Sequence, residues 1–273
     1  MRFLKLYDWK TNDPVKTEET ILSNLKKESI SSNFLVADYH WADSINKNGI
    51  QYTQKKIDDH VFAAKGKKII FICQHISAKN LNWHNSLVFS PHATINDNFI
   101  PIPHYSCFYS ENSLKKDLDA SFVGAFETHN CRKKISQLYK NYENWYIQDT
   151  GAWHFYNSFG RKEREKHYKD IMSRSKIILC PRGTGPGSIR LWECLSSNCL
   201  PIVISDTIQL PDELLNLIPV ISLESVVILD RIVNKCLEKD YNERIKKIKK
   251  IHDEKFSNNN LHAKVIDRVR NNE

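Results

Sequence analysis

The sequence predicts an α/β fold with two domains, each built on a parallel β-sheet. Short apolar runs alternate along the chain with segments of helical period, which is the order of elements in β-α-β units. The 273 residues are enough for two modest hydrophobic cores. In addition, residues 175–206 read as a strand, a glycine-rich loop, a helix and a second strand. A right-handed crossover of this kind joins parallel strands.

The N-terminal domain is expected to comprise residues 1–116. Helices are predicted at residues 17–27 and 51–64, where apolar side chains recur at helical spacing. Strands are predicted at residues 34–40, 68–73, 87–90 and 99–102. Strands that alternate with helices in this way indicate a parallel sheet that is covered on both sides.

The C-terminal domain is expected to comprise residues 117–273. Its strands are predicted at residues 121–126, 145–148, 177–180, 200–204 and 219–223. Its helices are predicted at residues 130–139 and 161–173, after Ser188, at 228–252 and around 261–269. The same alternation again indicates a parallel sheet.

Four polar side chains follow predicted strands of the N-terminal domain. Asp38 and His40 end the first of these runs, His75 follows the second, and His92 follows the third. Because the carboxyl ends of parallel strands meet at one edge of a sheet, these residues are candidates for a site at that edge. A buried histidine with satisfied hydrogen bonds is the commoner outcome for each of them, so the four remain alternatives.

The glycine-rich loop of the C-terminal domain is suited to a bound ligand. Gly183, Gly185 and Gly187 let the backbone take positive φ and approach a ligand closely. Ser188 is a good N-cap for the helix that follows. Free backbone N–H groups and the positive end of a helix dipole favour phosphate at such a place. A structural turn that is merely rich in glycine is the alternative.

Charged side chains flank this loop. Arg182 lies within it, and Arg190 lies in the first turn of the helix, where a cation opposes the helix dipole unless an anion is near. Glu193, one turn further on, is placed to accept hydrogen bonds from sugar hydroxyls. The spacing matches neither a Walker loop nor the dinucleotide fingerprint. We therefore expect a phosphate-type site of another kind.

Several motifs of this region, taken in order, resemble the exostosin family of glycosyltransferases. The matching segments are Cys180-Pro181-Arg182-Gly183, Ser188, Arg190-Leu191, Glu193, Cys199 through Asp206, and Leu210-Pro211. The family has Gly where this chain has Asn198. A weaker resemblance covers His84-Asn85 and His92-Ala93, where the family has Asp-His and His-Asp, so the carboxylate after His92 is missing. The resemblance spans roughly residues 68 to 215.

The resemblance implies the GT-B fold, in which two Rossmann-like domains face each other across a cleft. It also implies a nucleotide-sugar donor and inversion at the anomeric carbon. Gly124 and Arg132 match a strand, glycine and arginine that lie beside the nucleotide in the family, and Asp206 closes the matched segment. By analogy with the fold, the last helices are expected to cross back to the first domain.

The expected reaction moves a sugar from a nucleoside diphosphate, with UDP as the expected nucleotide, to a hydroxyl of a glycan. Arg182, the loop glycines and Arg190 are expected to hold the diphosphate, and Glu193 the ribose. A general base from the N-terminal half is expected to face the acceptor hydroxyl. Asp38, His40, His75 and His92 are its candidates.

No metal or other cofactor is expected. The sequence has neither a C-x-x-C pair nor an H-E-x-x-H motif. Its only D-x-D is Asp117-Leu118-Asp119, which follows two lysines where an apolar strand would be needed. Helix dipoles and arginines can supply the charge stabilisation that a metal provides elsewhere.

Composition leaves two other classes of function open. The formal net charge of +8 suits an anionic ligand, an acidic polymer or a membrane surface, although the lysines are scattered over helix faces. A non-enzymatic binder of acidic polymer or nucleic acid is one alternative, but no nucleic-acid-binding motif supports it. Another nucleotide-dependent enzyme, such as a sugar phosphorylase or a sulfotransferase, is the second.

The chain is expected to be a soluble or cytoplasmic protein. Its first residues contain no apolar stretch long enough for a signal peptide or a membrane span. Its seven cysteines are odd in number and lie mostly within apolar runs, which fits a reducing compartment. Binding to a membrane surface is not indicated.

Overall fold

The computed structural model describes residues 1–7, 16–29, 33–108, 115–151, 160–238 and 240–271, and the chain divides into two α/β units. The first unit comprises Met1–Tyr105, Thr207–Leu210 and Lys255–Glu273. The second comprises Ser106–Asp206 and Pro211–Glu254. The first boundary lies after Tyr105, whereas the sequence placed it after residue 116.

The first unit contains a five-stranded parallel sheet in the order β1-β2-β3-β4-β5. Its strands are β1 (Arg2–Leu4), β2 (Leu35–Ala37), β3 (Ile69–Ile72), β4 (Leu87–Ser90) and β5 (Ile100–Pro101). Asp38, His75 and His92 therefore follow the carboxyl ends of β2, β3 and β4, as the sequence predicts.

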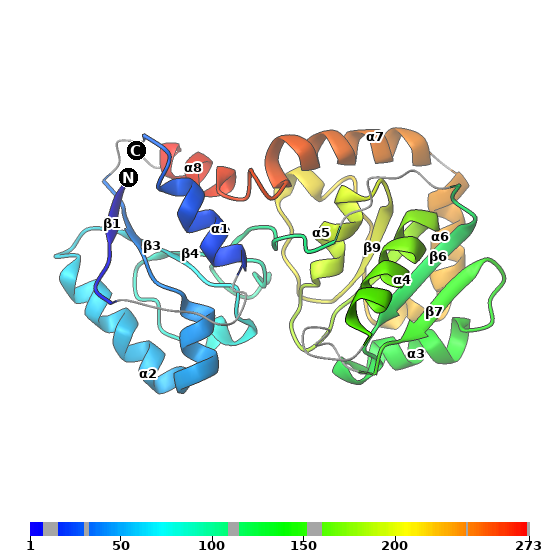
Figure 1. Ribbon diagram of the computed structural model, residues 1–273, viewed down its shortest axis with the longest axis horizontal. Helices are drawn as coiled ribbons and strands as arrows, with labels where there is room; N and C mark the ends of the chain where they lie inside the picture. Colours follow the sequence, from blue (N-terminus) through cyan, green and yellow to red (C-terminus); the bar gives the residue numbers. More distant parts are fainter. Residues whose placement is uncertain (8–15, 30–32, 109–114, 152–159, 239, 272–273) are drawn as a thin grey trace. The chain divides into compact units, whose positions relative to one another are not determined.

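Helices pack on both faces of this sheet. On one face, α1 (Lys16–Leu25) and α8 (Ala263–Arg270) bury their apolar side chains against β2, β3 and β4 (Figure 1). On the other, α2 (Trp41–Ala63) contributes Trp41, Ile45 and Ile57 to a second core. A 3₁₀ helix, η1 (Ile76–Asn80), follows β3. The two cores share the sheet because successive side chains of a strand point to opposite faces.

Helix α2 begins ten positions before the helix that the sequence predicts at 51–64. Gly49, with φ 81 and ψ 178, interrupts it with a kink, and Trp41–Asn48 forms a separate helical segment before that kink. This conformation is open almost only to glycine. The prediction missed the first segment because Gly49 and the polar residues before it conceal the apolar period.

The second unit contains another five-stranded parallel sheet, in the order β10-β9-β8-β6-β7. Its strands are β6 (Leu118–Gly124), β7 (Trp145–Asp149), β8 (Ser175–Pro181), β9 (Leu200–Ile204) and β10 (Val220–Ile221). Every residue of β9 is buried, as expected for an inner strand of a parallel sheet. The α/β class and the two parallel sheets are thus confirmed, and they agree with the GT-B architecture.

The helices of the second unit follow its strands. They are α3 (Asn130–Tyr139), α4 (Arg161–Arg174), α5 (Ile189–Ser196), α6 (Leu229–Glu238) and α7 (Tyr241–Ile251), with 3₁₀ turns η2 (Phe126–Thr128), η3 (Asp212–Leu214) and η4 (Glu224–Ile228), and the π-helical turn η5 (His252–Phe256) after α7. The single helix predicted at 228–252 is wrong. Asp240 has a φ of 53, and this left-handed residue precedes a new helix.

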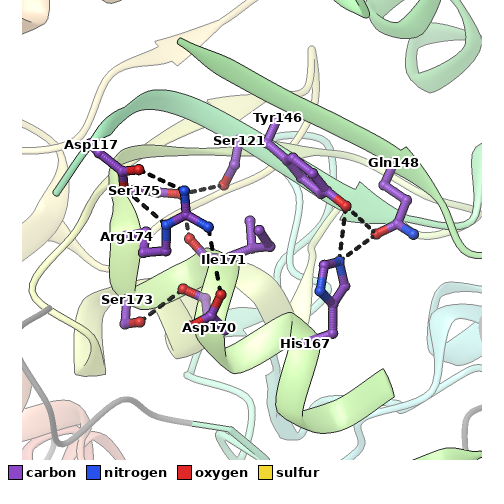
Figure 2. A network of polar contacts seen from close by, with 10 residues as sticks. All are labelled: Asp117, Ser121, Tyr146, Gln148, His167, Asp170, Ile171, Ser173, Arg174 and Ser175. Carbon is purple, nitrogen blue, oxygen red and sulfur yellow. Dashed lines mark hydrogen bonds and ion pairs between the residues drawn. The ribbon is translucent and has the colours of Figure 1, made fainter. Parts of the chain in front are cut away.

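Polar contacts fasten α4 to the second sheet (Figure 2). The Ser175 hydroxyl lies 2.7 Å from Ser121 Oγ on β6 and 2.6 Å from the Ile171 carbonyl. Midway along α4, His167 Nε2 lies 2.9 Å from both Tyr146 Oη and Gln148 Oε1 on β7. These side chains belong to the scaffold, because they attach the helix to two strands.

Among the described helices, none combines the length and the apolar character that crossing a membrane requires.

Candidate functional site

The glycine-rich loop lies where the order of strands along the second sheet reverses. β6 and β8 are neighbours, and β7 and β9 lie on their outer sides. The chain leaves β6 through α3 toward one side and leaves β8 through α5 toward the other. Open parallel sheets bind their ligands at the carboxyl ends of such a strand pair. We call this place, with the ends of β6 and β8 and the starts of α3 and α5, the crevice.

Arg132 ties the two strand ends of the crevice together. Its guanidinium donates to the carbonyls of Ala125 at 3.1 Å, Pro181 at 3.0 Å and Arg182 at 3.0 Å. Burial, and then the nearby charge of Arg190, lower the pKa of Arg132 to about 9. Sequence reasoning placed Arg132 beside the nucleotide. In the structure, carbonyl groups of both strand ends surround its charge.

Arg190 lies across the end of β6. Its guanidinium donates to the Val123 carbonyl and stacks on the Phe122 ring, 4.6 Å from the ring centroid. Gly124 makes this possible, because a Cβ there would lie 2.5 Å from Arg190 Nη2. Gly124 is therefore required by the close approach of an arginine.

Positive charge in the crevice lacks a matching acidic partner. The guanidinium groups of Arg132 and Arg190 both lie over the Phe122 ring, at 5.4 and 4.6 Å. Within the described part of the chain, neither group forms an ion pair with a carboxylate. Two cations held close together in this way favour an anion beside them.

Among the described residues, the side chain of Arg182 makes only weak hydrogen bonds, both within its own loop. It approaches the carbonyls of Gly183 at 3.4 Å and Thr184 at 3.3 Å, and it is half-buried. Such long contacts contribute little, so the side chain can turn toward a ligand. Gly183 leaves room for Arg132, since a Cβ there would lie 3.0 Å from Arg132 Nη2.

The other loop residues line the start of α5. None of Gly183, Gly185 and Gly187 adopts a positive φ, so their value is close approach rather than left-handed geometry. Ser188 is the N-cap residue of α5, as predicted, but its hydroxyl makes no capping hydrogen bond. The first turn of α5 therefore lacks a side-chain cap from this residue.

Glu193 lies beneath the crevice and is 2% exposed. Its Oε2 accepts a hydrogen bond of 2.8 Å from the Tyr168 hydroxyl. Burial raises the pKa of Glu193 to about 7, against the opposing effects of Tyr168, Arg190 and the backbone amides of Phe108 and Cys107. Sequence reasoning expected an accessible ribose ligand, whereas the structure shows a carboxyl group enclosed by protein.

Asp206 follows β9 and is exposed. Its Oδ1 accepts a hydrogen bond of 2.9 Å from the backbone amide of Leu223, just after β10. The other residues predicted to bind the sugar donor lie around the ends of β6 and β8. Asp206 lies at the end of β9, the strand next to β8.

His129 is a crevice residue that sequence reasoning missed. It caps α3, where its Nδ1 accepts from the Cys131 amide at 3.2 Å, so the neutral ring carries its proton on Nε2. Burial lowers its pKa, and the charges of Arg182 and Arg132 act in the same direction. Its position one residue before a clear helix start was the available signal.

The carboxyl edge of the first sheet collects the four candidate bases. Asp38 forms an ion pair with Lys26, whose Nζ lies 2.8 Å from Oδ2. His40 is 1% exposed and precedes α2 as its N-cap residue. Burial lowers the pKa of His40 to about 4. Both side chains are buried within the protein.

His75 uses both ring nitrogens. Its Nδ1 accepts from the Ser77 amide at 3.0 Å, and its Nε2 lies 3.0 Å from Asn46 Oδ1. With Nδ1 acting as an acceptor, Nε2 carries the proton and donates to Asn46. No ring nitrogen is then left to accept a proton from a substrate.

His92 forms a pair with His104, a residue that sequence reasoning missed. Their ring centroids lie 4.9 Å apart in a T-shaped arrangement. Nδ1 of each ring is buried without a hydrogen-bond partner among the described residues. Burial lowers the pKa of His92 to about 4, with a smaller effect from His75. His104 lies three residues after the end of β5, so its place after a strand was again the signal that could have identified it.

The D-x-D sequence lies at the opposite edge of the second sheet. Asp117 pairs with Arg174 at 2.6 Å, and Asp119, near the start of β6, pairs with Lys176 at 2.6 Å. Across the described residues, no cluster of three or more His, Cys, Asp or Glu side chains is arranged to hold a metal ion.

Known proteins resemble this chain over parts of its length. A probable glucuronosyltransferase of rice (Oryza sativa subsp. japonica) is 33% identical over 108 residues, which cover 36% of this chain and 22% of that protein. A probable beta-1,4-xylosyltransferase of Arabidopsis thaliana is 30% identical over 125 residues, which cover 45% of this chain and 27% of that protein. The matched segments are thus a minor part of these relatives.

One solved structure with a similar course of the chain is WaaG, a glycosyltransferase involved in lipopolysaccharide biosynthesis. It has a TM-score of 0.45 and 9% sequence identity, and the match covers 98% of this chain and 99% of that one. Residues 40–220, which include the carboxyl ends of β3, β4 and β5 and the whole crevice, match the exostosin GT47 domain. The chain therefore belongs to the exostosin GT47 family of glycosyltransferases.

Proposed function

We propose that this chain transfers a hexosyl or pentosyl group from a nucleoside diphosphate, with UDP as the expected carrier, to a hydroxyl of a glycan. The observation that carries the proposal is the pair of guanidinium groups of buried Arg132 and half-buried Arg190, which form no ion pair with a carboxylate among the described residues. A diphosphate would supply the missing negative charge. The relatives named above, glucuronosyl- and xylosyltransferases, support a sugar donor and a glycan acceptor.

The second unit is proposed to bind the donor. As the bond to the sugar breaks, negative charge grows on the departing diphosphate, and groups already in place stabilise it. Arg182 has the freedom to contact the phosphates directly, and Arg190 faces the same edge. The N-termini of α3 and α5 add positive dipole ends. Arg132 holds the strand ends that position these groups.

The first unit is proposed to supply the general base for an inverting displacement. His92 fits best, because it is half-buried rather than enclosed, its Nδ1 has no hydrogen-bond partner among the described residues, and its lowered pKa keeps the ring neutral at pH 7. Asp38 is the second candidate and must first leave Lys26. His75 is disfavoured because both of its nitrogens are engaged. His40 lies too deeply buried to reach a substrate without movement.

Catalysis is proposed to need no metal ion. The arginines and helix ends of the crevice supply positive charge, while both carboxylates of the D-x-D sequence are paired with cations at the far edge of the sheet. We expect transfer to proceed in EDTA at the rate seen without it. Loss of activity in EDTA that Mg²⁺ or Mn²⁺ restores would contradict this.

A ligand panel read by thermal shift, followed by a transfer assay, tests the proposal. UDP and UDP-sugars should raise the melting temperature of the protein, because a ligand that binds only the native state stabilises it. Release of UDP with labelling of a xylan-type or other glycan should follow. Stabilisation by a sulfate donor instead would favour a sulfotransferase. A salt-sensitive shift with acidic polymer, without donor turnover, would favour a binding protein.

A further inference from the structure

A buried carboxyl group joins three segments at the carboxyl edge of the first sheet. Glu18, on α1, is 0% exposed. Its Oε1 accepts from the Gln74 amide at 2.8 Å and from the Ala42 amide at 3.1 Å, and Oε2 lies 3.3 Å from the same Ala42 amide. Ala42 begins α2 after β2, and Gln74 follows β3. One side chain thus links α1 to the ends of two strands.

The link is reciprocal. Gln74 Oε1 accepts from the backbone amides of Thr17 at 2.9 Å and Glu18 at 3.3 Å, which satisfies two amides of the first turn of α1. Thr17 Oγ1 in turn accepts from the Tyr105 amide at 3.0 Å. The first turn of α1 therefore holds the segments that follow β2, β3 and β5.

Each backbone amide that bonds to the first turn of α1 lies within two residues of a histidine at the carboxyl edge of the first sheet. Ala42 lies two positions after His40, Gln74 precedes His75, and Tyr105 follows His104. His104 in turn contacts the ring of His92. A displacement at the start of α1 would therefore reach His40, His75 and His104 through one or two residues of chain, and His92 through its contact with His104.

We propose that Glu18 is a positioning residue for the acceptor side of the reaction, and that it holds these histidine-bearing segments in register. The inference rests on the proposed function, because it assigns the acceptor to this edge. Small misplacements of groups around a reacting hydroxyl cost large factors in rate. Glu18 itself does not touch the substrate, since it is fully enclosed.

A merely stabilising role fits Glu18 poorly. Burial raises the pKa of Glu18 to about 8, even though the backbone amides of Gln74, Ala42 and Trp41 favour the ionised form. Burying an ionisable group in this way is costly, and its hydrogen bonds to amides recover only part of that cost. A costly group with bonds to two strand ends is better explained by what it positions.

The test compares Glu18→Ala and Glu18→Gln with two control variants. Glu19→Gln changes the exposed neighbour on the same helix. Thr53→Val removes another fully buried polar group of the same unit, one that bonds to Ser44 and Gly49 on α2. Thr53→Val therefore reports what a loss of stability alone does to the kinetics.

For Glu18→Ala, we expect kcat/KM for the acceptor to fall about 10- to 100-fold, while the KM for the donor stays within about twofold because the crevice belongs to the other unit. Glu18→Gln keeps one acceptor oxygen, so its kcat/KM for the acceptor should lie between those of the wild type and Glu18→Ala. The glutamine variant also provides the test if the alanine variant does not fold. Equal losses in Thr53→Val, or an unchanged acceptor kcat/KM in both Glu18 variants, would overturn the proposal.

Hydrogen exchange separates this inference from the proposed function. In the Glu18 variants, peptides that contain Ala42 and Gln74 should exchange faster than in Glu19→Gln, whether or not a substrate is known. If the wild type transfers no sugar from any donor, the proposed function fails, and exchange still decides the anchoring. Unchanged protection of both peptides would refute the anchoring itself.

Discussion

The three arginines of the crevice make different contacts, and these contacts separate their roles. The side chain of Arg182 bonds only within its own loop among the described residues, whereas Arg132 donates to three carbonyls from two strand ends. A guanidinium that binds a diphosphate needs donors free for the phosphates, whereas the donors of a guanidinium that holds strand ends are already occupied. Two guanidinium groups of the crevice thus have different roles, one in binding the diphosphate and the other in holding the strand ends.

Replacing Arg182 with alanine should lower kcat/KM for the donor by about 2–4 kcal/mol of transition-state stabilisation. The melting temperature should hardly change, because no strong contact is lost. Arg132→Ala is the matched control, since it should lower stability by about 3 kcal/mol by leaving buried carbonyls without donors. Steady-state kinetics and thermal melts of both variants measure this contrast. Normal kinetics in a folded Arg182→Ala protein would remove Arg182 from the site.

Gly124→Ala should affect the donor site through Arg190. A new Cβ would meet Nη2 of Arg190 at 2.5 Å, so the guanidinium must leave the face of Phe122. The far end of a flexible side chain can move, and we therefore expect donor affinity to fall about tenfold or more with little loss of stability. Calorimetric titration with UDP checks this. Unchanged affinity would show that Arg190 does not hold the nucleotide.

Sequence reasoning found the residues around the glycine-rich loop but not their contacts. Arg132 and Arg182 stand 50 residues apart in the chain, and the bond between them depends on how β6 and β8 pair. His104 and Glu18 carried no motif, because a histidine after a proline and a glutamate in a helix are ordinary patterns. Their importance arises from burial and partners, which a linear sequence does not display.

At the level of secondary structure elements, predictions succeeded where the apolar period is unbroken. The bounds of β4, β9 and α3 agree with those expected from the sequence. The failures occur at residues with unusual φ. Gly49 interrupts α2 next to a polar stretch that hides the apolar period, and Asp240 precedes α7 although apolar residues continue at helical spacing through that place. A periodic pattern does not report a change of backbone direction within it.

Gly49→Ala should destabilise the first unit by about 1–3 kcal/mol. No atom lies within 4 Å of the position that a Cβ would occupy, so the effect comes from the backbone conformation alone. Chemical denaturation measures the loss. Gly49→Asn should lose about as much, because a ψ of 178 lies outside the left-handed helical region that asparagine tolerates. Equal stability of wild type and Gly49→Ala would show that the kink can straighten.

On the scale of the whole molecule, buried ionisable groups should shape the dependence of stability on pH. The pKa values of His40 and His92 are lowered to about 4 by burial, so these rings stabilise the fold above about pH 6.5 and lose that contribution as the pH falls toward 4. The raised pKa values of Glu18 and Glu193, about 8 and about 7, act in the other direction. Their contribution is complete below about pH 4.5 and is lost as the pH rises through those values.

Burial also lowers the pKa values of His60, His75 and His104, so the histidines outnumber the two glutamates on the acid side. The melting temperature should therefore be highest near pH 6.5 and should fall on both sides. A series of thermal melts between pH 4 and 9 measures this. Glu18→Gln should flatten the alkaline side, because glutamine cannot ionise, and His92→Gln should flatten the acid side. A melting temperature that rises steadily up to pH 9 would contradict the burial of the two glutamates.

The division of the chain into units has a consequence for synthesis on the ribosome. The first unit takes residues from three separate stretches, and its core contains Leu261 together with Val265, Ile266 and Val269 from α8. Nascent chains emerge from the N-terminus, so the strands of the first sheet leave the ribosome long before the helix that covers them. The second unit, whose residues all precede Lys255, can close while the first still waits for its last helix. Although its strands are made first, the first unit is completed last.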